Sequence, residues 1–218
     1  MPKKSTNVDY QELERQLSCP TGAYGEEVGR EMDATNIGMT TSSFQFLNLE
    51  ENDRVLELGH GNCGHFDKVI PPDFNIAYHG LEISKIMCQQ AKKNHGSQAR
   101  FNFYDGMNLP FSDDSFSKII SINTIYFWRE PKRLISEIER VLKQTGICVL
   151  TYAEKKFMVG LPFVKKLFKL YYTSEISRLI KNTSLTINDH KQKTEYVKSK
   201  DGNFVKRKYS MVKLCKKP

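Results

Sequence analysis

The strongest constraint on the fold of this chain is a glycine-rich stretch that directly follows an apolar run. Residues 54–58 are mostly apolar, and three closely spaced glycines come next: Gly59, Gly61 and Gly64. Residues 65–70 can then begin a helix. We therefore predict a strand, a tight turn and a helix N-terminus. The first glycine permits the turn, the second lets the backbone approach a ligand, and the third lets the helix pack on the strand. The free N–H groups of the helix start favour a polar or anionic group.

Two classes of ligand compete for this turn. The glycines satisfy G-x-G-x-x-G, the dinucleotide pattern, which alone is a weak signal. Glu57, an acid inside the apolar strand, favours the other class. Its carboxylate would repel a pyrophosphate, but it can attract the positive methionyl amine of S-adenosylmethionine, directly or through water. The structural alternative is that Glu57 only caps the loop by accepting hydrogen bonds from backbone N–H groups.

Length and composition predict one globular domain over residues 1–218, with 39% hydrophobic and 27% charged residues. We expect a helical cap over 1–50, a cofactor-binding core over 51–155, and a lid helix with a C-terminal hairpin over 156–218. No apolar run approaches the ~18 residues of a membrane span and the N-terminus lacks a signal-peptide core, so a cytoplasmic location is expected. The five cysteines lack C-x-x-C spacing, and no metal site or disulfide framework is predicted.

Positive charge is concentrated in the C-terminal third. Residues 1–150 carry 16 Lys and Arg against 20 Asp and Glu, whereas residues 151–218 carry 17 against 5. Such a segment is compatible with nucleic acid, an anionic membrane surface or an anionic substrate, but a solvated lysine-rich face is the more common explanation. Contact with nucleic acid or a membrane is therefore not the favoured interpretation. The oligomeric state is left open.

The spacing of apolar residues predicts an α/β fold. Strands are expected at five places: 54–58, 76–82, 99–104, 116–122 and 147–152. Helices are expected between them and before the first strand: 9–17, 26–33, 41–49, 65–70, 84–94 and from 131 onward. Strands that alternate with helices imply a doubly wound, mostly parallel sheet. An amphipathic basic helix is expected at 161–172, another helix at 174–181, and a hairpin from 185–199 and 203–214 with its turn at Asp201-Gly202.

Acidic residues stand at the strand ends, where open parallel sheets bind ligands. Glu82 ends the second strand and can accept hydrogen bonds from both hydroxyls of an adenosine ribose; alternatively, it places negative charge at the helix that Ser84 caps. Asp105 and Gly106 follow the third strand. Asp105 can accept a hydrogen bond from an adenine amino group, and Met107 can pack on the ring face.

Aromatic residues gather at the end of the fourth strand, where the only tryptophan lies. Tyr126 and Trp128 are candidates to face a positive sulfonium or a cationic acceptor. Phe163 and Phe168, on the expected lid helix, are candidates to wall an apolar acceptor pocket with them. The alternative is an ordinary core-packing helix. Methyl transfer requires in-line positioning and exclusion of water, and no catalytic residue is predicted.

These motifs resemble the class I S-adenosylmethionine-dependent methyltransferases, particularly the small-molecule type similar to methyltransferase domain family 11. Residues 55–64 are similar to the first family motif, 80–84 to the second, 105–111 to the adenine-side motif and 121–128 to the fourth-strand motif. The resemblance implies a seven-stranded, Rossmann-like sheet with an antiparallel last strand, and S-adenosylmethionine as cofactor. It also implies ten cofactor-binding residues: Glu57, Gly59, Gly61, Gly64, Glu82, Ile83, Asp105, Gly106, Met107 and Asn123.

The chain departs from the family pattern at His60, where a small residue is usual. This histidine either lies near the cofactor or packs in the loop, the more common role. The expected activity is methyl transfer to a small-molecule acceptor by in-line displacement. Three alternatives remain open: a methyltransferase for RNA or a lipid that uses the basic C-terminal third, a nicotinamide-dependent reductase, and a non-catalytic cofactor-binding subunit.

Overall fold

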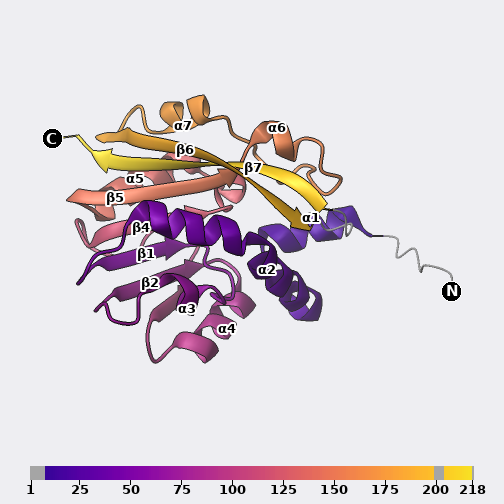
Figure 1. Ribbon diagram of the computed structural model, residues 1–218, viewed down its shortest axis with the longest axis horizontal. Coiled ribbons are helices and arrows are strands. Elements are labelled where there is room, and N and C mark those ends of the chain that lie inside the picture. Colours follow the sequence, from indigo (N-terminus) through magenta and orange to yellow (C-terminus); the bar gives the residue numbers. More distant parts are fainter. Residues whose placement is uncertain (1–7, 199–203, 218) are drawn as a thin grey trace.

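The computed structural model describes residues 8–198 and 204–217 (Figure 1). Within them, seven strands form one sheet in the order β3-β2-β1-β4-β5-β7-β6. Their bounds are β1 Arg54–Leu58, β2 Ala77–Glu82, β3 Arg100–Phe103, β4 Phe116–Ile122, β5 Leu142–Ala153, β6 Leu185–Lys198 and β7 Phe204–Lys216. The pairs among β1 to β5 are parallel, and β7 is antiparallel to both β5 and β6. The predicted doubly wound, mostly parallel sheet with an antiparallel last strand is confirmed.

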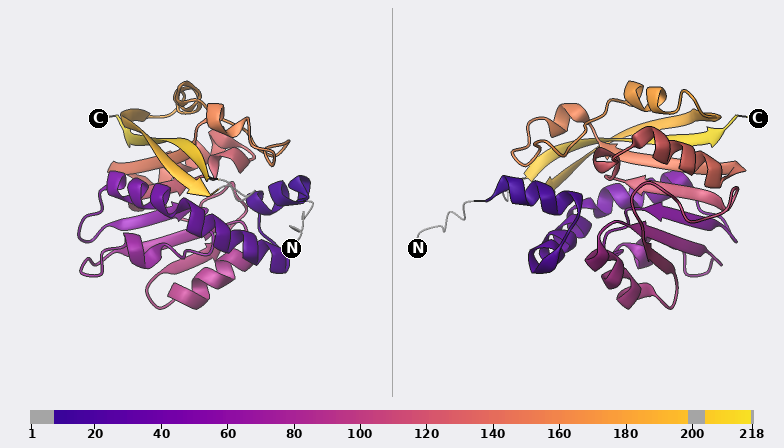
Figure 2. Two further views of the ribbon diagram at one scale, coloured as in Figure 1. Left: turned by 45° about the vertical axis from the view of Figure 1, so that its right-hand side comes forward. Right: turned by 180° about the vertical axis from the view of Figure 1, so that it is seen from behind.

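Helices cover both faces of the sheet (Figures 1 and 2). Their bounds are α1 Tyr10–Ser18, α2 Gly22–Leu47, α3 Phe66–Val69, α4 Lys85–His95, the short 3-10 helix η1 Ile125–Phe127, α5 Pro131–Val141, α6 Lys155–Met158 and α7 Thr173–Leu179. One hydrophobic cluster holds residues of α5 and α7, and the other holds residues of α2, α3 and α4. Side chains of the central strands are divided between these clusters, as Ile119 and Ile120 are on β4.

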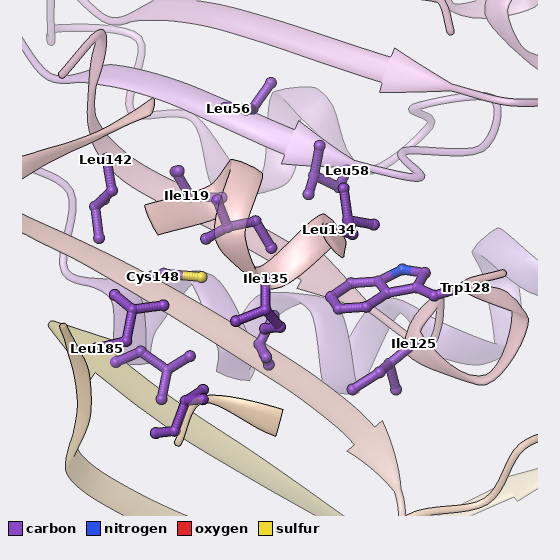
Figure 3. Packing of buried hydrophobic residues seen from close by; sticks show 14 of the residues in the cluster. Leu56, Leu58, Ile119, Ile125, Trp128, Leu134, Ile135, Leu142, Cys148 and Leu185 are labelled. Carbon is purple, nitrogen blue, oxygen red and sulfur yellow. The ribbon is translucent and has the colours of Figure 1, made fainter. Parts of the chain in front are cut away.

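Helix α5 illustrates how the local sequence specifies its element. Pro131 occupies the first helical position, where its missing N–H costs nothing. Four apolar residues at helical spacing are then buried against the sheet: Leu134, Ile135, Ile138 and Val141. Figure 3 shows Leu134 and Ile135 beside Trp128 and Ile125, in the same cluster as Leu56 and Leu58 of β1. The carboxyl end of β4 is therefore anchored in the core.

The N-terminal region differs from the prediction, because α2 is one helix of 26 residues rather than two short ones. The polar residues interpreted as a break at 33–40 lie inside it. The Thr35 hydroxyl donates to the Glu31 carbonyl oxygen at 2.7 Å, and Asn36 Oδ1 accepts from Arg207 at 2.7 Å. Because these side chains bond the helix itself or a distant strand, they do not terminate the helix.

The predicted lid helix at 161–172 is wrong. Helix α6 ends at Met158, and the residues from 161 to 172 are irregular. Three of their backbone N–H groups donate to distant parts of the chain: those of Lys165 and Leu167 to Glu14 Oε1 at 2.8 and 2.9 Å, and that of Lys169 to the Tyr126 carbonyl oxygen at 3.0 Å. These tertiary partners replace the i to i−4 bonds of a helix.

The C-terminal hairpin is present as predicted in its two strands, which pair as far as Lys198 and Phe204. The expected turn at Asp201-Gly202 lies outside the described residues. Strand β5 begins at Leu142, earlier than expected, and its pairing with β4 shifts register between Phe116 and Lys118. In the described part of the chain, no helix is both long and apolar enough to cross a bilayer.

Candidate active site

A cavity of about 460 Å³ opens at the carboxyl ends of β1, β2 and β4, next to the point where the strand order reverses. Open α/β sheets bind ligands at this place. Eight of the ten cofactor-binding residues expected from the sequence line it: Glu57, Gly59, Gly61, Glu82, Ile83, Asp105, Gly106 and Asn123. Residues of α1 and α2 line the opposite side, among them Leu17, Met32 and Asp33. The N-terminal helices thus cover the glycine turn.

The glycine turn has three residues with positive φ, Gly59 at 76°, Gly61 at 60° and Cys63 at 56°. A Cβ on Gly59 would lie 2.3 Å from Thr124 Cγ2, so this position is closed by the protein itself. A Cβ on Gly61 would meet no atom within 4 Å, so its space is open to a ligand. Gly64 differs from the prediction, because it does not line the cavity. A Cβ at this position would lie 2.4 Å from Asp33 Oδ2, so the absence of a side chain lets Asp33 of α2 approach the turn closely.

Glu82 holds the turn and the next helix together. Its Oε2 accepts from Gly61 N–H at 2.9 Å and its Oε1 from Ser84 N–H at 2.8 Å. Ser84 caps α4 by accepting from Met87 N–H, as predicted. Burial raises the pKa of Glu82, although the two backbone N–H groups oppose this shift. Each carboxylate oxygen keeps a lone pair that can accept a hydrogen bond from a hydroxyl group.

Glu57 lies in a buried ion pair. Its Oε2 accepts from the Tyr78 hydroxyl and lies 2.9 Å from His65 Nε2, and the other ring nitrogen of His65 lies 3.8 Å from Asp33 Oδ1. Burial alone would lower the pKa of His65, but Glu57 and Asp33 outweigh it and raise the pKa to about 10. Burial alone would raise the pKa of Glu57, but His65 and Tyr78 lower it. Both groups are therefore charged at neutral pH.

His60 is buried in the wall of the same cavity, and its ring lies 4.9 Å from the ring of Phe101. Within the described residues, neither of its ring nitrogens has a hydrogen-bond partner. Burial, helped by the charge of His65, lowers its pKa to about 4 despite the attraction of Glu57. The imidazole is therefore neutral at pH 7 and packs against the strands.

The loop after β3 places Asp105 and Gly106 at the cavity, whereas Met107 is not among the residues that line it. Asp105 Oδ1 accepts from the N–H groups of Met107 and Asn108, each at 2.8 Å, and the Asn108 side chain donates to Oδ2. Asp105 is exposed, and these hydrogen bonds hold its pKa below the usual range. The expected adenine contact of Met107 is thus not supported by its position, whereas Asp105 lies where it was expected.

A second cavity of about 120 Å³ adjoins the first and is mostly apolar. The two share five lining residues: Leu17, Met32, Asn36, Asn123 and Phe127. Three of the four residues expected at an acceptor pocket line the second cavity: Tyr126, Phe163 and Phe168. Trp128 instead lines the first, with its indole N–H donating to Thr124 Oγ1 at 3.0 Å. The Tyr126 hydroxyl is buried and donates to Asn123 Oδ1 at 3.0 Å.

The lining residues that were not singled out in the sequence include Asp33, Asn36, His65 and Phe127. Asp33 and Asn36 fell in the segment interpreted as a break, although their spacing of three places them on one face of a helix. His65 directly follows the last glycine of the turn, and Phe127 lies between two residues that were chosen. Predicting a continuous helix through 33–40 would have placed Asp33 and Asn36 on the same face.

Comparison with known proteins agrees with this geometry. Residues 56–150, which run from β1 to β5 and contain the glycine turn and the strand ends, match a family model described as a methyltransferase domain. Residues 56–150 of this chain are thus similar to a methyltransferase domain. The resemblance expected from the motifs is therefore confirmed.

The relatives of this chain differ in how much of their length is matched. YrhH of Bacillus subtilis, named as a methyltransferase, is 30% identical over 104 residues, which are 46% of this chain and 57% of YrhH. The solved structure of YcgJ of Bacillus subtilis has a TM-score of 0.66 at 16% identity and covers 84% of this chain and 98% of its own. The structure of a SAM-dependent methyltransferase of Thermotoga maritima has a TM-score of 0.66 at 18% identity, and the match covers 95% of this chain and 100% of the Thermotoga chain. The two structures establish the fold.

Proposed function

We propose that this chain transfers a methyl group from S-adenosylmethionine to a small, largely apolar molecule. One observation carries the proposal: two adjoining cavities share Asn123 and Phe127, and the larger is lined by the glycine turn while the smaller has apolar walls. A cofactor and an acceptor in these cavities would meet at the shared residues. Such a junction is what an in-line displacement requires.

The residues of the larger cavity fit S-adenosylmethionine. The open space beside Gly61 would receive the ligand against the backbone. Glu82, held by two backbone N–H groups, would accept hydrogen bonds from the ribose hydroxyls, and Ile83 and Asp105 would flank the adenine side. A buried carboxylate next to the turn disfavours the pyrophosphate of a dinucleotide, which supports this cofactor over a nicotinamide.

The positive methionyl amine would lie near Glu57, His65 and Asp33. Because His65 is charged, it compensates one of the two carboxylates, and the group of three keeps one net negative charge. Asp33 is the more accessible carboxylate, with 24% of its side chain exposed against 3% for Glu57. Asp33 would thus contact the amine directly, and Glu57 would act mainly by holding His65 in place.

When bound, the cofactor supplies a methyl group on a sulfonium that is already electrophilic. The protein then has to orient the acceptor and exclude water. Phe127 and Phe168 pack with ring centroids 4.7 Å apart and both line the second cavity. Their aromatic faces would keep the junction dry and favour positive charge. No side chain is assigned as a general base.

Calorimetry with S-adenosylhomocysteine and with NAD tests this proposal. We expect the wild type to bind S-adenosylhomocysteine and not NAD, and Glu82→Gln to weaken that binding. Binding of NAD alone would point to the reductase alternative and contradict the proposal. Binding of S-adenosylhomocysteine without turnover of any small apolar acceptor in a methyl-transfer screen would favour the non-catalytic subunit.

A further inference from the structure

The second cavity lies beside the last described residues of β6 and the first residues of β7. Val197 and Val205, a cross-strand pair, both line it. Ala153 at the end of β5 pairs with Tyr209, so residues 204–208 of β7 extend past the carboxyl end of β5. Figures 1 and 2 show the end of β6, the start of β7 and α6 at the same end of the molecule. The acceptor cavity is therefore bounded by a projecting pair of strands.

The outer face of this hairpin end carries aromatic and basic side chains. Successive side chains of a strand point to opposite faces, and of the neighbours of Val197 and Val205 only Lys198 also lines the cavity, whereas Tyr196, Phe204 and Lys206 do not. These neighbours form two cross-strand pairs, Tyr196 with Lys206 and Phe204 with Lys198. Phe204 is 76% exposed and Tyr196 73%, the two highest values among the large hydrophobic side chains of the described residues.

Residues 159–168, on another side of the cavity, also expose large apolar side chains next to lysines. Leu161, Phe163 and Phe168 line the cavity, while Val159 is 62% exposed and Leu167 is 45% exposed. The side chains of Lys165 and Lys166, next to Leu167, are also exposed. The mouth of an apolar cavity is thus flanked by two segments that each expose large apolar groups beside lysines.

Exposed aromatic and aliphatic residues among lysines match the chemistry of an anionic bilayer surface. Aromatic rings settle at the headgroup level, aliphatic groups enter the acyl boundary, and lysines near an anionic surface are attracted to its headgroups. Nucleic acid would attract the lysines and stack on the aromatics, but it offers nothing to Val159 and Leu167. The excess of 17 basic over 5 acidic residues after residue 150 supplies the complementary charge.

We propose that the outer face of the β6–β7 end and the segment around Val159 and Leu167 dock on an anionic membrane, and that an apolar acceptor enters the second cavity from the bilayer. The docking surface is defined by Val159, Leu167, Tyr196, Lys198, Phe204 and Lys206. Only the entry of the acceptor rests on the proposed methyl transfer. Docking itself does not.

Co-sedimentation with vesicles tests the docking surface. We expect the wild type to bind vesicles of phosphatidylcholine and phosphatidylglycerol more tightly than vesicles of phosphatidylcholine alone, and less tightly as salt increases. The double variants Tyr196→Ser/Phe204→Ser and Lys198→Glu/Lys206→Glu should each weaken binding to the anionic vesicles by about tenfold or more. The matched controls lie elsewhere on the surface: Phe74→Ser, and Lys92→Glu/Lys93→Glu on α4. They should bind as the wild type does.

Affinity for S-adenosylhomocysteine, measured on the same variants, separates the two proposals. Unchanged affinity with lost vesicle binding supports docking and also verifies folding. Vesicle binding without any cofactor binding would contradict the proposed function and leave docking in place. Absence of wild-type binding to anionic vesicles, or equal binding by all variants, overturns docking. A third outcome is that the wild type binds single-stranded RNA but not vesicles, and that the Lys198→Glu/Lys206→Glu variant no longer binds RNA. This outcome would overturn membrane docking and identify the surface as a nucleic-acid-binding site.

Discussion

His65 Nε2 lies 2.9 Å from Glu57 Oε2 in the interior of the protein, directly behind the glycine turn. The contact joins the start of α3 to β1, and Tyr78 of β2 donates to the same carboxylate oxygen. Asp33 of α2 lies on the other side of the imidazole. A buried carboxylate is costly unless it is paired, and here one cation stabilises it and links the N-terminal helices to the turn.

Two histidines five positions apart should titrate on opposite sides of neutrality. The pKa of His65 is raised to about 10, so its imidazole should stay charged at pH 8, whereas His60, with a pKa of about 4, should stay neutral at pH 6. NMR of the imidazole nitrogens across this range measures both. Titration of either ring between pH 6 and 7 would contradict the burial and pairing described above.

The free energy of unfolding should depend on pH through the same pair of His65 and Glu57. The folded pKa of His65 lies above its ordinary value of 6.5, so its contribution is complete below pH 6.5 and is lost as pH rises through about 10. Within that window the slope for one proton is about 1.4 kcal/mol per pH unit. The contribution of Glu57, whose pKa is lowered, is present above pH 4.5 and lost on acidification. The difference in free energy of unfolding between wild type and His65→Gln should therefore shrink from pH 7 to pH 10.

Glu82→Ala should weaken binding of S-adenosylhomocysteine by on the order of 2 kcal/mol, because two charge-assisted hydrogen bonds to ribose would be lost. The variant also removes the acceptors of Gly61 and Ser84 N–H, so calorimetry has to be paired with a thermal melt. Glu50→Ala, at an exposed position before β1, is the control. Wild-type affinity in a folded Glu82→Ala would mean that the cofactor site is misplaced.

Gly61→Val should abolish binding of S-adenosylhomocysteine while the fold survives. A side chain there meets no protein atom, and the strain of its positive φ is about 1–2 kcal/mol. Gly22→Val is a matched control, because Gly22 has φ 63° and equally open space at the start of α2, away from the turn. We expect similar drops in melting temperature for both variants and lost binding for Gly61→Val alone. Equal affinities would show that the ligand does not approach Gly61.

Glu14→Ala should loosen the irregular segment that replaces the expected lid helix. Glu14 is buried and accepts two of its backbone N–H groups, so its removal should cost about 2 kcal/mol of unfolding free energy. Hydrogen exchange at Lys165 and Leu167 should accelerate, whereas the exposed control Glu27→Ala should leave it unchanged. Unchanged exchange in Glu14→Ala would mean that other contacts order the segment.

Phe163→Ala should change the affinity for an apolar acceptor and leave that for S-adenosylhomocysteine within about threefold, or ~0.7 kcal/mol. Phe163 lines only the second cavity, and it is only partly buried. Phe168→Ala should act in the same direction with a larger loss of stability, because Phe168 also packs on Tyr126 and Phe127. Binding of a fluorescent apolar probe provides the measurement. A large drop in melting temperature with unchanged probe binding would assign both rings to the core.

The sequence alone determined the parallel sheet and the position of the turn. The five predicted strands match β1 to β5 in order, and Glu82 and Asp105 line the cavity expected from their places at strand ends. These features were predictable because they depend on short-range patterns: apolar runs of strand length, glycines that permit positive φ, and the rule that parallel strands bind ligands at their carboxyl ends.

Only the tertiary structure decided the continuity of α2, the irregular path of 161–172 and the pairing of Glu57 with His65. Local signals suggested a break within α2 and a helix at 161–172, and distant groups overrode both. Glu14 accepts the N–H of Lys165, 151 positions away, and Arg207 donates to Asn36, 171 positions away. A buried polar group forms a hydrogen bond with whichever partner the fold places beside it, and the local sequence does not identify that partner.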